Sequence, residues 1–178
     1  MEAWKHLRAI LLPVTGAVVI PGFILWLTGP DALGLWQSAP AARVGLAILG
    51  GVLVCLGLVL MVATIRLFVT VGQGTPAPWN PPQRLVVRGV YRHVRNPMIA
   101  GVLFVVLGEA VLAASLPLLG LFALAVIVNA VYIPLSEEPG LAKRFGEEYE
   151  VYQRNVPRWI PRLRPWPTDP PGHDTTTS

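Results

Sequence analysis

Long apolar runs without charge constrain this chain more than any other feature of its sequence. Residues 44–65 contain no charged side chain, and residues 98–135 contain a single one, Glu109. A helix needs about 20 apolar residues to cross the hydrocarbon core of a bilayer. With 53% hydrophobic and only 13% charged residues, the chain is too apolar for an ordinary soluble domain. The runs predict an all-α integral membrane protein.

The lengths of the runs predict about four transmembrane helices. Residues 7–27 are the first candidate and residues 44–65 the second, whereas residues 98–135 are too many for one span and suit a helical hairpin. The step Ser115-Leu116-Pro117 should break this last run, because proline cannot donate the helical hydrogen bond and clashes with the preceding turn.

Single residues within these runs carry further expectations. Pro13 and Pro21 should kink the first span. Ala47 and Gly51 form a small-xxx-small spacing that favours close helix packing, with a lipid-binding face as the alternative. Cys55 is expected to be a buried, inert thiol. Glu109 should face the interior of the bundle or be protonated, since an exposed charge at mid-membrane is costly.

Basic residues are distributed very unevenly around these spans. With four spans, the two termini and the loop at residues 66–97 share one side and hold 13 of the 14 lysines and arginines, and Arg43 alone lies on the other side. Because positive residues favour the cytoplasmic side, we expect both termini in the cytoplasm. Topology therefore explains the basic charge, and no nucleic-acid partner is expected. We divide the chain into two amino-terminal spans (1–65), a functional region (66–165) and a disordered tail (166–178).

Two polar stretches flank the hairpin and should meet at one membrane face. Residues 84–101 read RLVVRGVYRHVRNPMIAG, and residues 136–161 read SEEPGLAKRFGEEYEVYQRNVPRWIP. The arginines of the first could be a collar on anionic headgroups, and Glu137 and Glu138 could be helix-start residues capped by Ser136. The second stretch mixes aromatic and charged residues, which predicts an amphipathic carboxyl-terminal helix. Our hypothesis is that the two stretches together enclose a cofactor.

The two stretches resemble the isoprenylcysteine carboxyl methyltransferase family, and more broadly the membrane methyltransferases that include phospholipid N-methyltransferases. The resemblance rests on LVxxGVYRxVRNPM followed, after the hairpin, by EExxLxxxFGEEYxxYxxxVPRWIP, and it covers about 90 of 178 residues. It implies S-adenosyl-L-methionine as methyl donor and a lipidic or small hydrophobic acceptor. The asparagine of RNPM is typical of bacterial members, so the expected location is a bacterial inner membrane.

The resemblance also implies a set of cofactor contacts. They fall on residues of the loop, of the start of the third span and of the end of the hairpin: Gln73, Gln83, Arg84, Leu85, Val86, Tyr91, Asn96, Pro97, Met98, Ile99 and Glu137. No catalytic residue is assigned and no metal site is expected.

Three features depart from the family pattern, and one of them is the helix-unfriendly step Glu138-Pro139-Gly140 at the acid pair. Ile99 stands where the family has a tyrosine, and Ile133 where it has an arginine. The resemblance therefore does not extend to recognition of a prenylcysteine carboxylate, and the acceptor could be a carboxylate, a thiol or an amine. Two alternatives stay open: an NADPH-dependent enzyme similar to the sterol reductases, and a non-catalytic lipid-binding membrane protein with the same fold.

Overall fold

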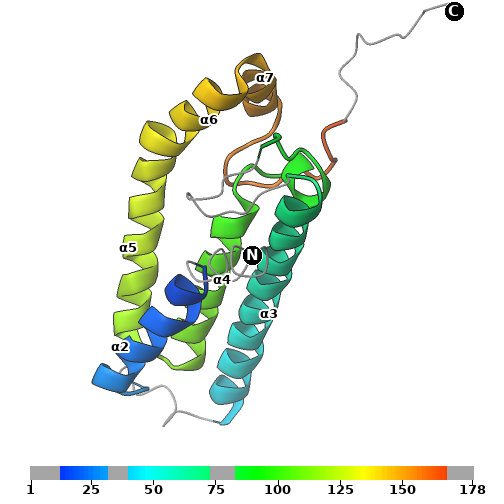
Figure 1. Ribbon diagram of the computed structural model, residues 1–178. Helices are drawn as coiled ribbons and strands as arrows, with labels where there is room; N and C mark the ends of the chain where they lie inside the picture. The colour runs from blue at the N-terminus through cyan, green and yellow to red at the C-terminus, as the bar shows by residue number, and fades with distance from the viewer. Residues whose placement is uncertain (1–12, 32–39, 73–82, 168–178) are drawn as a thin grey trace, which may run out of the picture.

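The computed structural model describes residues 13–31, 40–72 and 83–167, and these residues contain helices and turns but no β-strand. The all-α prediction is confirmed. In chain order the α-helices are α2 (Ile20–Thr28), α3 (Pro40–Thr70), α4 (Pro97–Leu112), α5 (Leu116–Tyr132), α6 (Glu138–Phe145) and α7 (Glu147–Asn155). Figure 1 shows the long helices side by side, with α6 and α7 folded over one end of them.

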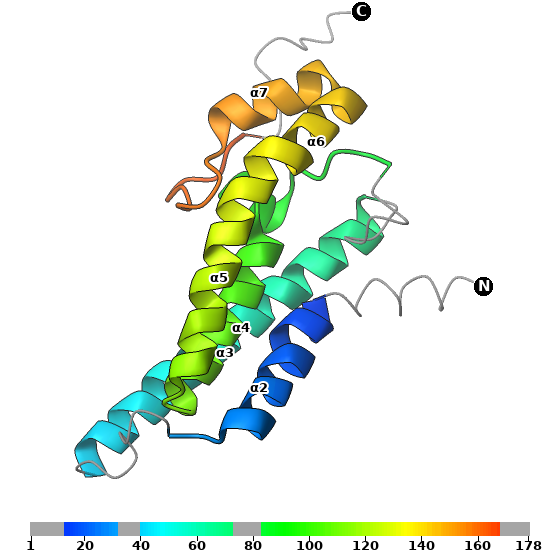
Figure 2. The ribbon, with the colours of Figure 1, turned by 90° about the vertical axis from the view of Figure 1, so that its left-hand side faces the viewer.

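Glycines bring the backbones of α3 and α4 into contact. A Cβ atom added to Gly57 would lie 2.5 Å from the carbonyl oxygen of Gly101, and one added to Gly50 would lie 2.9 Å from that of Gly108. The two pairs show that the helices run antiparallel, in agreement with Figure 2. The predicted close packing of helices is therefore present. The prediction that Ala47 and Gly51 make the contact is wrong, because Gly51 has open space around its Cβ position.

The hairpin between α4 and α5 lies where the sequence placed it. The turn occupies residues 113–115, with Ala114 at φ 45°, and Ser115 caps α5 by accepting the backbone N–H of Leu118 at 3.4 Å. Pro117 therefore lies in the first turn of the new helix, where its missing N–H costs nothing. The backbone N–H of Asp31 donates to Ala113 O at 2.7 Å, which joins the chain after α2 to the same end of the bundle.

Two π-helical turns accompany prolines. Thr15–Val19 precedes Pro21, and Ile133–Glu137 contains Pro134 and continues α5 into α6. Because proline has no N–H to donate, the regular hydrogen-bond ladder is interrupted at these points, and the helix absorbs the defect as a wider turn. The expected helix start at Ser136 is wrong, since that residue lies inside this continuous helical stretch.

By length and composition, two of the described helices could cross a membrane: Ala41–Thr70 and Leu116–Phe145. Two shorter apolar helices, Thr15–Thr28 and Pro97–Leu112, lie beside them. Ala17, Met61 and Val105 form a small buried cluster where three of these helices meet. The outer faces stay apolar, as suits contact with lipid, and Cys55 lies on such a face, so its predicted burial is wrong.

Candidate functional site

The two polar stretches meet at the end of the bundle that α6 and α7 cover. After α7 the chain turns back as a C-terminal strap, residues 156–167, which pairs with residues 92–95. Arg95 donates its backbone N–H to Pro157 O at 3.0 Å, Arg162 donates to His93 O at 2.9 Å, and Trp166 donates to Arg92 O at 3.0 Å. The predicted meeting of the stretches is therefore found. The packed region extends through Trp166, so the tail begins later than the predicted boundary at residue 166.

Glu138 holds the two stretches together. Its Oε1 accepts from Arg95 Nη1 at 2.8 Å and from Arg158 Nε at 2.7 Å, and its Oε2 accepts from Arg158 Nη2 at 2.8 Å and from Gln153 Nε2 at 2.9 Å. The side chains of Glu138 and Arg95 are only 7% and 9% exposed. The hydrogen bonding of Arg158 to the Glu138 carboxylate raises the pKa of the Arg158 guanidinium. Glu138 is thus a structural ion-pair centre, and the helical stretch from α5 runs through it without a break.

A tyrosine cluster fixes α7 against the loop. Tyr149, Tyr152 and Val156 are buried together, and the Tyr152 hydroxyl donates to Tyr91 O at 2.8 Å. Burial raises the pKa of both Tyr152 and Tyr91, so both phenols stay protonated at neutral pH. The sequence predicts an amphipathic helix here. The helix α7 fits that prediction, because it buries only the side that carries its tyrosines.

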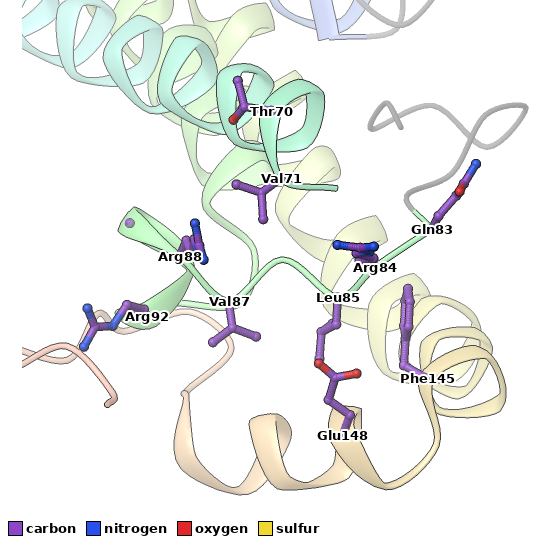
Figure 3. A pocket seen from close by; sticks show the side chains of 11 residues that line it. Thr70, Val71, Gln83, Arg84, Leu85, Val87, Arg88, Arg92, Phe145 and Glu148 are labelled. Carbon is purple, nitrogen blue, oxygen red and sulfur yellow. The ribbon is translucent and has the colours of Figure 1, made fainter. Parts of the chain in front are cut away.

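The chain between Gln83 and the turn Gly89–Arg92 alternates its side chains between two sides. Leu85 and Val87 pack on the tyrosine cluster, whereas Figure 3 shows Arg84 and Arg88 on the opposite side, toward the end of α3. A cleft of about 920 Å³ opens along this segment. Its described lining residues come from the end of α3, the segment itself and the helices α6 and α7: Thr70, Val71, Gln83, Arg84, Leu85, Val87, Arg88, Gly89, Arg92, Phe145 and Glu148.

The structure brings only some of the predicted cofactor contacts to this cleft. Gln83, Arg84 and Leu85 line it. The other described ones lie deeper. Val86 and Tyr91 are buried in the loop; Pro97 is buried and Asn96, Met98 and Ile99 are half-buried at the start of α4; and Glu137 is half-buried near the end of the continuous helix that α5 begins. Gln73 lies outside the described residues. No ligand tests these assignments, which stay predictions.

Two buried hydrogen-bond donors at the start of α4 have no partner among the described residues. They are Arg95 Nε and Asn96 Nδ2. Asn96 occupies the position before the first turn of α4, but its side chain makes no capping hydrogen bond. Buried donors are nearly always paired, so this pair indicates a polar partner that the described residues do not supply. The sequence predicted Asn96 as a cofactor contact but did not predict the roles of Arg95 and Arg158. The signal for these two was the number of arginines that could pair with the adjacent acids Glu137 and Glu138.

Comparison with known proteins identifies the family of this chain. The model of the phospholipid methyltransferase family matches residues 46–148, which is more than half of the chain and includes most of α3, all of α4, α5 and α6, and the start of α7. The chain belongs to the phospholipid methyltransferase family. In a separate comparison, a Schizosaccharomyces pombe protein-S-isoprenylcysteine O-methyltransferase is 32% identical over 84 residues, which cover 47% of this chain and 36% of that relative. No solved structure gives a significant match.

Membership of the phospholipid methyltransferase family confirms the resemblance drawn from the two motifs. The match to the yeast enzyme covers about a third of its length, so its acceptor is not carried over to this protein. Ile133 is completely buried.

Proposed function

We propose that this protein is a membrane-embedded methyltransferase that uses S-adenosyl-L-methionine to methylate a lipidic or small hydrophobic acceptor. Membership of a methyltransferase family supports the reaction class. The apolar outer faces of the long helices support a lipid environment and an acceptor drawn from it.

The observation that carries the proposal is the pair of unpartnered buried donors at the start of α4, Arg95 Nε and Asn96 Nδ2. The cofactor has a carboxylate that can accept from such donors, and the amino terminus of a helix favours a negative group. The residues present therefore fit the cofactor. When bound, it supplies an electrophilic methyl group on a positively charged sulfur.

The protein's contribution would be positioning and exclusion of water. Methyl transfer needs the acceptor in line with the sulfur and little covalent help, so correct placement can supply much of the rate. Glu137, half-buried next to the Glu138 ion pairs, would accept hydrogen bonds from the cofactor's hydroxyl or amino groups. Glu138 would keep the strap closed over the loop through Arg158.

For the membrane arrangement we propose four spans with both termini in the cytoplasm of a bacterial inner membrane. Asp31 and the turn at residues 113–115 share one end of the bundle, and the arginine-rich residues 84–95 lie with α6 and α7 at the other. This division agrees with 13 of the 14 basic residues on one side. A periplasm-active reporter fused after Pro165 should be silent, and an active one would contradict this orientation.

Calorimetric titration of the purified protein with S-adenosylhomocysteine and, separately, with NADPH tests the proposed cofactor. The proposal expects saturable binding of S-adenosylhomocysteine and none of NADPH. The opposite pattern would assign the protein to the reductase alternative, and binding of neither would leave a non-catalytic lipid-binding protein.

A further inference from the structure

Two arginines outside the predicted cofactor contacts lie where the end of α3 packs against the loop, Arg66 on α3 and Arg88 on the loop. Arg66 is exposed in the last turns of α3, and Thr70, one turn later, lines the cleft together with Arg88. A Cβ atom on Gly89 would lie 3.2 Å from Leu67 Cδ1, so the loop at residues 88–89 abuts the turn of α3 that carries Arg66. Neither guanidinium has a hydrogen bond or ion pair with any residue in the described part of the chain.

The charge of the cleft does not suit the cofactor as its sole occupant. Arg84, Arg88 and Arg92 line it against one acid, Glu148, among the described lining residues. S-adenosylmethionine is a cation at neutral pH because of its sulfonium, so this surplus of positive charge repels it overall. An anionic group is the better electrostatic partner for the side of the cleft that faces α3.

An apolar stripe on α3 leads directly to these arginines. Leu58, Val59, Val62 and Ala63 line a shallow hollow of about 340 Å³ that ends at Arg66. Val59 is 64% exposed and Val62 is 47% exposed. Since Val62, Arg66 and Thr70 follow one another at intervals of four, they lie on the same face of the helix. An apolar stripe that ends in unpaired cations matches a molecule with a hydrocarbon chain and an anionic head.

We infer that Arg66 and Arg88 form the headgroup end of a binding site for an anionic amphiphile of the bilayer, whose chain lies along the stripe at residues 58–63. The ligand class is a single- or double-chain lipid with a phosphate head. The site is separate from the cofactor donors Arg95 and Asn96, and its existence does not depend on methyl transfer.

The test uses the purified full-length protein in neutral maltoside micelles. Calorimetry measures binding of palmitoyl lysophosphatidic acid, of inorganic phosphate and of the uncharged monopalmitoyl glycerol. The same titrations are run on the double variant Arg66→Gln/Arg88→Gln and on a matched double variant, Lys143→Gln/Arg154→Gln, whose exposed cations lie on α6 and α7 away from the cleft.

We expect saturable binding of the lysophosphatidic acid, at least tenfold tighter than of either other probe. Loss of two charge-assisted hydrogen bonds should weaken it at least tenfold in Arg66→Gln/Arg88→Gln and less than twofold in the matched variant. S-adenosylhomocysteine affinity should stay within twofold in both variants. Equal amphiphile affinity in the two double variants would overturn the inference, as would equally tight binding of inorganic phosphate. A parallel fall in S-adenosylhomocysteine affinity would assign the arginines to the cofactor instead. A parent protein that binds the amphiphile but not S-adenosylhomocysteine would contradict the proposed function and leave this site standing.

Discussion

The contact between α3 and α4 and the contact between the strap and the loop hold the molecule together in opposite ways. The helices meet where side chains are missing, at Gly57 against Gly101 and at Gly50 against Gly108. The strap and the loop meet where the carboxylate of Glu138 accepts hydrogen bonds from Arg95 and Arg158. In lipid there is little hydrophobic gain from bringing two apolar helices together, so close backbone packing supplies the attraction. At the polar end the paired charges fix which segments lie together.

The largest expected effect is on the polar contact. Glu138→Gln removes the charge that Arg95 and Arg158 share, and leaves a nearly buried Arg95 without its counter-ion. Breaking a buried ion pair from one side costs about 3 kcal/mol, so we expect the free energy of unfolding to fall by about that amount. Thermal or chemical unfolding in detergent measures the change.

Two neighbouring acids serve as controls for that experiment. Glu150→Gln removes an exposed 3.5 Å pair with Arg154 and should change stability by less than about 0.5 kcal/mol. Glu137→Gln should also leave stability nearly intact. It should lower the affinity for S-adenosylhomocysteine about tenfold or more, because one charge-assisted hydrogen bond is lost. If Glu138→Gln is as stable as Glu150→Gln, then the strap is not held by this ion-pair centre.

The next effect concerns the apolar contact. Gly57→Ala places a Cβ atom 2.5 Å from the carbonyl oxygen of Gly101, and backbone must shift to accept it. Overpacking of this kind costs about 1–3 kcal/mol. Gly51→Ala is the matched control on the same helix, since its Cβ position is open, and it should gain up to about 1 kcal/mol from helix propensity. Melting temperatures that move together in the two variants would contradict the glycine contact.

The smallest stability effect should come from a neutral hydrogen bond at the polar end. Tyr152→Phe removes the 2.8 Å hydrogen bond to Tyr91 O and leaves that carbonyl without this donor. We expect a loss of about 1 kcal/mol in the free energy of unfolding. Tyr132→Phe, at an exposed tyrosine of α5, should cost much less, and an equal loss in both would show that the hydrogen bond is not the cause.

The apolar half of this fold was more predictable from sequence than the polar half, for a physical reason. The helices and the hairpin follow from local runs and from the Ser115 to Pro117 step, which act within a few residues. The register of α3 on α4 was not predictable in the same way: several glycines could have made the contact, and only the partner helix selects Gly50 and Gly57 over Gly51.

The polar end depends on residues far apart in the chain. Arg95 and Glu138 are separated by 43 positions, and Arg92 and Trp166 by 74. The sequence indicated that these stretches meet, because both flank the hairpin, but it could not choose which of two adjacent acids takes the arginines. The structure assigns them to Glu138, which leaves Glu137 available for another partner.

The central claim is that the start of α4 binds S-adenosyl-L-methionine, and calorimetry of S-adenosylhomocysteine binding to Asn96→Ala tests it most directly. The side chain of Asn96 makes no capping hydrogen bond, so its removal should leave the fold intact, as a thermal melt would verify. Asn129→Ala is the control, since Asn129 Nδ2 donates to Ala125 O within its own helix. We expect the affinity for S-adenosylhomocysteine to fall at least about tenfold in Asn96→Ala, because one charge-assisted hydrogen bond is lost. We expect it to be unchanged in Asn129→Ala. Equal affinities for the parent and both variants would contradict the claim.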